Sequence, residues 1–178
     1  MLIQKQDAEL LALFIFSSLP DEVTRSEARE ILLACGELNK MEIDGYISEL
    51  ESRSQIYIKS RNNNTAAEKY VGITELGTAV VAAFGDKKPL FRGAVNKSLR
   101  CYKKIVCGVD YRIDLAKTNG GSNVKFEMLV AGKLYFSTTL FFAKSMDALK
   151  VYNRLDDDPE SFYNSVMTVA TGEIDYLV

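Results

Sequence analysis

The order of the predicted elements in the first 83 residues is the feature that most constrains the fold. Three short segments, each with one apolar face at helical spacing, are followed by two β-rich runs and then by a fourth helical segment. The two runs, Ile56–Lys59 and Tyr70–Ile73, enclose the turn signal Asn62-Asn63-Asn64 and predict a hairpin. We therefore expect a compact three-helix core that carries a hairpin and a closing helix.

Capping residues predict where these helices begin and end. Asp7 is a candidate N-cap for a first helix that runs to about Leu19. Thr24, with Glu27 three residues later, has the pattern of a capping box, and Gly36 can end this second helix in a left-handed conformation. Asn39 is the N-cap candidate of the third helix, and Thr74 is that of the fourth.

The third helix and the hairpin resemble parts of known bacterial regulators. Four apolar residues run from this helix into the hairpin: Ile43, Ile47, Leu50 and Ile56. Their spacing resembles that of the recognition helix and first wing strand of multiple-antibiotic-resistance-type and phenolic-acid-type repressors. The run Ile73-Thr74-Glu75-Leu76-Gly77 resembles the L-T-x-x-G segment that closes their wing and opens the next helix. The resemblance implies that the first half is a winged helix-turn-helix domain.

The whole chain is also similar to a bacterial family of unknown function, in which a winged helix precedes a linking helix, a small antiparallel sheet and C-terminal helices. Gly85-Asp86 and Pro89 predict a boundary between two domains, 1–88 and 89–178, with a linking helix over Leu90–Lys104. Alternating apolar and polar residues then predict strands in Ile105–Leu115 and Val124–Val130, and a third strand is predicted in Leu134–Phe142. The turn signals Asn119-Gly120-Gly121 and Ala131-Gly132 separate them and predict an antiparallel sheet.

Two C-terminal helices complete the second half. Ser145 is predicted to cap the first, which runs to about Leu155, and the other begins at Asp158-Pro159, an N-cap followed by a proline at the first helical position. An antiparallel sheet with one apolar face needs such a cover. The predicted fold class is therefore α+β in the second half, behind an N-terminal winged helix.

Several classes of function are excluded or disfavoured by composition. None of the 178 residues is a histidine, which excludes Ser-His-Asp and Cys-His nucleophile arrangements and histidine-based metal sites. The cysteines at 35, 101 and 107 match neither a zinc site nor a redox pair, and are expected to fill the core. The run Asp156-Asp157-Asp158 could bind a metal, but an Asp-Pro pair before a helix is more often a cap. We expect no enzymatic activity, no metal and no cofactor.

The apolar stretch Leu10–Phe16 is far too short to span a membrane, and Asp7 and Glu9 precede it. It also lacks the small-residue cleavage site of a signal peptide after its end. We therefore expect a cytoplasmic protein with no membrane contact.

Candidate DNA contacts lie on the third helix and on the hairpin. Exposed positions of the third helix include Lys40 and Ser48, but four acids and two bases lie between Lys40 and Arg53. Carboxylates are a minority choice near base edges and phosphates, so this helix departs from the repressor pattern. The hairpin offers the further candidates Lys59, Arg61, Asn63 and Lys69. They suit a wing that touches a phosphate backbone; the alternative is ordinary surface charge on a solvated loop.

The linking helix carries the strongest local charge signal. Seven bases and no acid occur between Lys87 and Val109, whereas residues 1–88 carry 10 Lys and Arg against 14 Asp and Glu. The basic face comprises Arg92, Lys97, Arg100, Lys103 and Lys104. It could bind phosphate or an acidic protein surface, or simply be solvated. The opposite, apolar stripe is expected to carry dimerisation or packing between the domains; it comprises Phe91, Val95, Leu99 and Tyr102.

These patterns favour a winged-helix transcription regulator that binds DNA as a homodimer. A single winged helix contacts few base pairs, and a two-fold partner doubles the interface. The alternative is a non-catalytic protein-interaction module whose acidic winged helix contacts a protein instead of DNA. The sequence indicates neither an effector molecule nor an operator.

Overall fold

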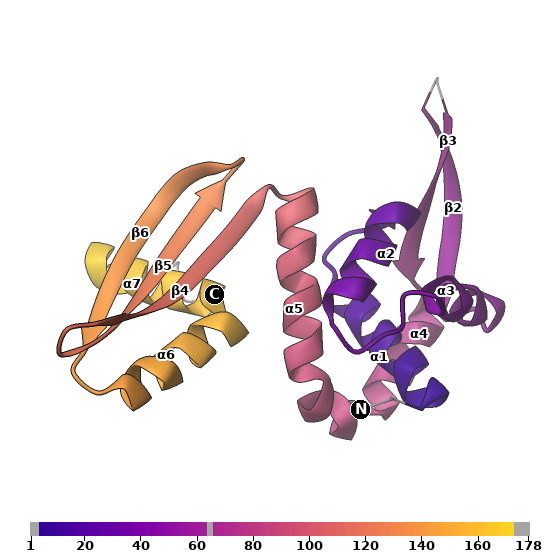
Figure 1. The fold of residues 1–178 in the computed structure, drawn as a ribbon. Helices are drawn as coiled ribbons and strands as arrows, with labels where there is room; N and C mark the ends of the chain where they lie inside the picture. The colour runs from indigo at the N-terminus through magenta and orange to yellow at the C-terminus, as the bar shows by residue number, and fades with distance from the viewer. Residues whose placement is uncertain (1–3, 64–65, 173–178) are drawn as a thin grey trace. The chain divides into compact units, whose positions relative to one another are not determined.

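The computed structural model describes residues 4–63 and 66–172, apart from the side chains at positions 62, 63, 66 and 67. Within these ranges the chain forms seven α-helices and two three-stranded antiparallel sheets, which is an α+β fold (Figure 1). The chain divides into two compact units, Met1–Val106 and Cys107–Val178, and each has its own hydrophobic core. None of the described helices is both long and apolar enough to cross a membrane.

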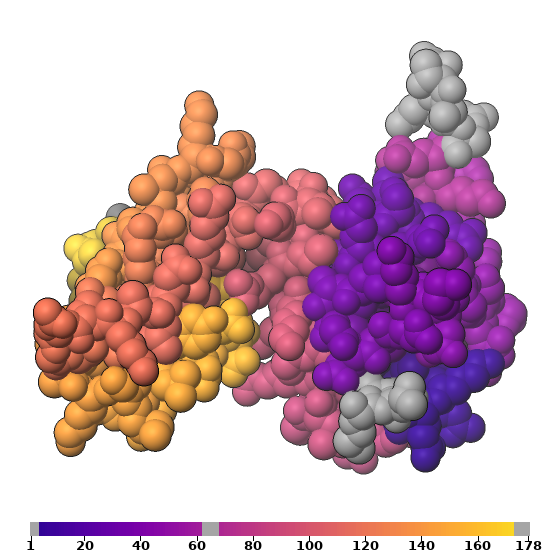
Figure 2. All heavy atoms as spheres, in the orientation of Figure 1, coloured from indigo at the N-terminus to yellow at the C-terminus, as the bar shows by residue number. Residues whose placement is uncertain are grey.

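The first unit contains helices packed beside a small sheet. In chain order its elements are α1 (Lys5–Ser18), β1 (Val23–Thr24), α2 (Arg25–Ala34), α3 (Ile43–Ser52), β2 (Ile56–Asn63), β3 (Ala66–Ile73), α4 (Glu75–Ala83), the 3₁₀ turn η1 (Gly85–Lys87) and α5 (Lys88–Val106). The sheet has the order β1-β3-β2, and β1 adds to the hairpin through the pair Val23 and Val71. The hairpin strands are longer than predicted and project beyond the helices of this unit (Figures 1 and 2).

The predicted start and end of α2 are confirmed. The Thr24 hydroxyl accepts a hydrogen bond from the Glu27 backbone N–H at 3.2 Å, and the Glu27 carboxylate accepts one from the Thr24 N–H at 2.8 Å. Gly36, just beyond the helix, has a φ of 77°. The capping box works because both partners are local, three residues apart in the chain.

Two predicted caps in the first unit are wrong. Gln4 is the N-cap of α1, while the Asp7 carboxylate in the first turn pairs with the Lys87 ammonium at 2.7 Å. Asn39 accepts from the Met41 N–H in a separate turn, and α3 begins only after Glu42. Both side chains are of a type that often caps a helix. Asp7 instead makes a tertiary ion pair, and Asn39 instead forms a local turn.

Thr74 caps α4, as predicted, and the close packing of α4 depends on Gly77. The Thr74 hydroxyl oxygen accepts from the Gly77 N–H at 3.0 Å and lies 2.7 Å from the carbonyl oxygen of Ser54. A Cβ added at Gly77 would lie 2.1 Å from the carbonyl oxygen of Gln55. This glycine therefore sets how closely α4 approaches the start of the hairpin.

We expect opposite effects from alanine at Gly77 and at Gly45, which both occupy the third position of a helix. Gly77→Ala should lower the free energy of unfolding by about 1–3 kcal/mol because backbone must shift. Gly45→Ala should raise it by up to about 1 kcal/mol, since a Cβ at Gly45 meets no atom within 4 Å. Urea unfolding of both variants tests this, and equal effects would contradict the packing of α4.

The helix α5 belongs to the first unit. Phe91 and Tyr102 are buried against α1 and α2, and the rings of Phe91 and Phe14 are 5.6 Å apart. The buried Ser98 hydroxyl donates to the carbonyl oxygen of Ile31 at 2.7 Å. The structure thus divides the chain after Val106 and not at the predicted 88/89, because α5 shares the core of the preceding helices.

The second unit is a sheet covered by helices. Its elements are β4 (Val109–Thr118), β5 (Gly121–Val130), β6 (Lys133–Phe142), α6 (Ser145–Asp157) and α7 (Pro159–Thr171), and the sheet order is β4-β5-β6. Both predicted turns are present, with positive φ at Gly120, Ala131 and Gly132. The predicted first strand began too early, at Ile105, because α5 extends through Val106.

One face of this sheet packs on α6 and α7 (Figure 1). Phe126, on the central strand, has no solvent exposure and touches aromatic rings from the sheet and from α7. The Asp158 carboxylate accepts from the Ser161 N–H at 3.2 Å, which confirms the predicted cap of α7. Ser145 is not the cap of α6; Lys144 occupies that position without a side-chain bond, and the Ser145 hydroxyl pairs with the Ser122 hydroxyl.

Candidate nucleic-acid interface

The helix α3 buries one face and exposes the opposite one. Its apolar residues lie in the core of the first unit: Ile43, Tyr46, Ile47 and Leu50. The exposed side contains Gly45 and Ser48, two small residues that leave the helix surface open. Lys40, in the turn before the helix, is also exposed. The two candidates predicted here, Lys40 and Ser48, are therefore accessible to a ligand.

The acidic character of α3 is balanced by bases that come from α2. The Asp44 carboxylate pairs with the guanidinium of Arg29 at 3.2 Å and with that of Arg25 at 3.5 Å. These two arginines lie one helical turn apart on α2, and sequence analysis of the third helix alone missed them. The i, i+4 spacing of two arginines was the available signal, but nothing local indicated that they face Asp44.

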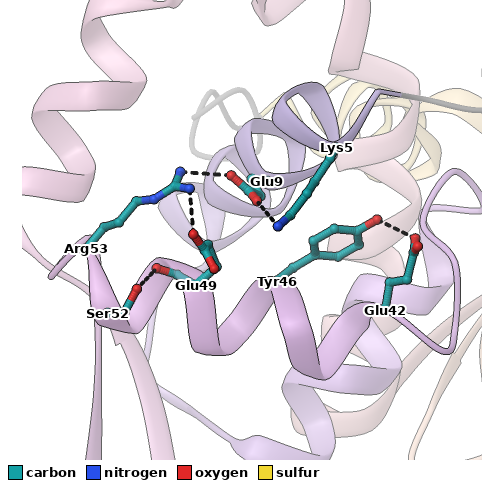
Figure 3. A network of polar contacts seen from close by, with 7 residues as sticks. All are labelled: Lys5, Glu9, Glu42, Tyr46, Glu49, Ser52 and Arg53. Atoms are coloured by element: carbon teal, nitrogen blue, oxygen red, sulfur yellow. Dashed lines mark hydrogen bonds and ion pairs between the residues drawn. The ribbon is translucent and has the colours of Figure 1, made fainter.

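A second set of contacts holds the other end of α3 against α1. The Arg53 guanidinium pairs with Glu49 at 2.7 Å and with Glu9 at 2.8 Å, and Glu9 also lies 3.8 Å from the Lys5 ammonium (Figure 3). Only 4% of Glu9 is exposed, so its carboxylate is shielded from solvent, whereas the Arg53 side chain is 48% exposed. We conclude that Glu49 is part of a structural contact between α1 and α3.

Another acid of this region is also engaged within the chain. The Tyr46 hydroxyl donates to the Glu42 carboxylate at 2.7 Å (Figure 3). Burial of Tyr46, together with this hydrogen bond, raises its pKa to about 12. Tyr46 therefore stays protonated at any physiological pH and remains a donor to Glu42.

Two of the three bases of the hairpin converge on one carboxylate. Glu22, just before β1, accepts a short hydrogen bond from the Tyr57 hydroxyl and pairs with Arg61 at 3.0 Å and Lys59 at 3.4 Å. The hydrogen bond from Tyr57, aided by the two bases, lowers the pKa of Glu22, and the same bond raises the pKa of Tyr57. Glu22 is thus ionised at neutral pH and offsets part of the positive charge of the hairpin.

Aromatic rings hold the same bases along the strands. The Lys59 ammonium lies 4.1 Å from the ring centre of Tyr57, and the Arg61 guanidinium lies 4.7 Å from that of Tyr70. Lys69, the third predicted base, is exposed on β3. The side chain of Asn63, the fourth predicted contact, lies outside the described part of the chain. The structure brings Lys59 and Arg61 together, through a residue that sequence analysis did not single out.

The basic face and the apolar stripe of α5 lie where the sequence predicted them, but the stripe is packed against the core of the first unit. Arg92, Lys97 and Lys104 are exposed, while Arg100 and Lys103 are half-buried. Phe91 and Tyr102 lie in the core of the first unit, with Val95 packed against it, and Leu99 is half-buried. Of the two predicted roles, packing against the preceding helices fits Phe91 and Tyr102. They are not available as a dimer surface.

The Asp156–Asp158 run is used as a helix boundary. Asp158 caps α7, and Asp156 and Asp157 form the last turn of α6. Within the described ranges, no group of three or more Cys, Asp or Glu side chains is placed to hold a metal ion.

Comparison of the chain with protein family models, with curated proteins and with solved structures found no match in any of the three.

Proposed function

We propose that the first unit is a winged-helix DNA-binding domain and that the protein is a cytoplasmic, non-catalytic transcription regulator that acts as a homodimer. The order of elements carries this proposal: three helices, a hairpin whose sheet is completed by β1, and a closing helix. In this interpretation α3 is the recognition helix, and β2 and β3 form the wing.

The chemistry of the exposed α3 surface supports the proposal. Gly45 and Ser48 allow close approach to a groove, while Arg25, Arg29 and Lys40 flank this surface. Three bases against two acids, Asp44 and the exposed Glu42, leave this part with a small positive balance, which suits phosphate contacts at the edge of a groove. The count of charges along α3 alone does not include the two arginines of α2.

A second candidate function, a module that binds another protein, is favoured by one observation. Glu22 pairs with both Lys59 and Arg61 and offsets one of their two charges, so the proposed wing has less charge to offer to phosphates without a rearrangement. An interface with a protein partner would not need those bases to be free. The two candidates therefore predict different effects of removing the Glu22 charge.

We expect the parent protein to bind duplex DNA weakly and with a shallow salt dependence. Glu22→Gln should tighten binding and steepen the slope of log affinity against log salt by about 0.9 for each base that reaches a phosphate, so by up to about 1.8. Fluorescence anisotropy of a labelled duplex, measured from low to physiological salt, tests both expectations.

The matched control is Glu75→Gln, which removes the same charge from an exposed position at the start of α4. It should change the slope much less, because only a long-range repulsion from the phosphates is removed. Equal slopes for the two variants would remove the wing from the DNA interface. No binding by the parent even at low salt would reject the DNA proposal and leave the protein-interaction module.

A further inference from the structure

The strand β6 is an open edge of the second sheet. It pairs with β5 on one side, and no described strand lies on its other side. None of its ten residues is fully buried, whereas the central strand β5 buries Ser122, Val124, Phe126 and Leu129. Backbone donors and acceptors along one side of β6 therefore lack a strand partner among the described residues.

The two edges of this sheet differ in their protection. The other edge strand, β4, carries the charged residues Asp110, Arg112, Asp114 and Lys117. Such charges discourage pairing with another chain. From Leu134 to Phe142, β6 contains no charged residue, proline or glycine. Three of its large apolar side chains are 60–67% exposed: Leu134, Tyr135 and Phe141. A register shift leaves Tyr135 without a partner on β5, whereas residues 136–142 pair regularly with β5, so this regular part of the edge is a template for an added strand.

The side chains of β6 are symmetric in chemical type about Thr138. Ser137 and Thr139 flank the centre, and Phe136 and Leu140 follow. The next pair outward is Tyr135 and Phe141. When two identical strands pair antiparallel about a two-fold axis through one residue, these are the pairs that face each other across the seam. Hydroxyl would then meet hydroxyl, and aromatic would meet aromatic.

We propose that two copies of this chain pair antiparallel through β6, in a register centred on Thr138, and form one continuous six-stranded sheet. Ser137 of each copy lies opposite Thr139 of the other on the face turned away from α6 and α7, and Tyr135, at the register shift, adjoins Phe141 of the other copy. The occupant is a second copy because the sequence of this edge is complementary to itself. The proposal deepens the proposed function, since it supplies the dimer surface that α5 does not provide.

The first test is the mass of the protein in solution by light scattering over a range of concentrations. The parent should be a dimer, and Ser137→Lys with Thr139→Lys should halve the mass while the circular dichroism spectrum is kept. Both positions are exposed, so this variant keeps the core. The control is Ala116→Lys with Thr118→Lys, two exposed positions on the β4 edge, which should stay dimeric.

The second test addresses the register. In a background with Cys101→Ser and Cys107→Ser, Ser137→Cys chains are mixed with Thr139→Cys chains under mild oxidation. Directly opposed residues have Cβ atoms about 4.5–5.5 Å apart, close to disulfide geometry, whereas positions displaced along the seam are farther apart. The mixture should yield a covalent dimer at least severalfold faster than either variant alone. Equal rates in all three samples would overturn the register.

Three outcomes would overturn the pairing itself. One is a parent protein that remains monomeric at every concentration, with fast hydrogen exchange at the alternate β6 amides that point away from β5. Another is a monomer in which those amides are protected, which would mean that the same chain covers the edge. The third is a dimer that survives the Ser137→Lys and Thr139→Lys changes. Because a monomeric variant keeps the first unit, its salt-dependent DNA binding tests the proposed function separately.

Discussion

Phe91→Ala is expected to destabilise the first unit by about 3–5 kcal/mol, the usual cost of removing a buried phenylalanine side chain. Phe91 is 8% exposed and packs on Phe14 of α1 with ring centres 5.6 Å apart. Removing its ring leaves a cavity where α5 meets α1, and also removes an aromatic pair. Urea unfolding, followed by hydrogen exchange of amides in α1 and α5, measures the effect.

The neighbouring residue provides the control for this prediction. Leu90 is 78% exposed, so Leu90→Ala should change the free energy of unfolding by less than about 0.5 kcal/mol. If Phe91→Ala lowers the mass in solution but leaves the free energy of unfolding unchanged, the packing of α5 described here is wrong. In that case the apolar stripe would be a dimer surface after all.

Phe126→Ala should have a comparably large effect on the second unit, again about 3–5 kcal/mol. Its ring is fully buried. The centre of this ring lies 5.0 Å from the ring centre of Phe162, 5.9 Å from that of Tyr111 and 6.1 Å from that of Phe136. These contacts join the sheet to α7, so the cavity would open at the centre of the smaller core. Near-ultraviolet circular dichroism and hydrogen exchange in β5 should both report the loss.

Val169→Ala on α7 is the matched control, because Val169 is 86% exposed and its truncation removes no core contact. We expect its unfolding curve to overlay that of the parent. If Phe126→Ala also overlays the parent, the interior of the second unit is not the aromatic cluster described above. Phe91→Ala and Phe126→Ala together assign each unfolding signal to its own unit.

Elements set by local interactions were predictable from the sequence. The Thr24–Glu27 capping box, the Thr74 cap and the Asp158 cap each join residues three positions apart, so the pattern contains the whole contact. The turns at Gly120 and Gly132 require positive φ, which the sequence signals directly. The alternation in the second half was sufficient for β4 and β5, because side chains of a strand point to opposite faces in turn, and β6 followed from the turn before it.

The candidate interface was predictable only in part. Lys40, Ser48, Lys59, Arg61 and Lys69 were found as residue types at exposed positions of a helix and a hairpin. Their electrostatic setting was not, since it depends on residues distant in sequence. Glu22 reaches the hairpin bases across 37 and 39 positions of the chain, and Arg25 reaches Asp44 across 19. No periodicity or spacing rule carries information about such pairs.

The sequence by itself determined where most helices, strands and turns lie, because capping, periodicity and backbone preference act within a few residues. Only the tertiary structure decided which unit α5 joins. Its apolar stripe was equally compatible with a dimer seam and with a core, and an amphipathic helix does not specify what it packs against. The cluster formed with α1 and α2 settled that choice for Phe91 and Tyr102. Burial of those two side chains stabilises the helix within its own chain, so they are not available to a second copy.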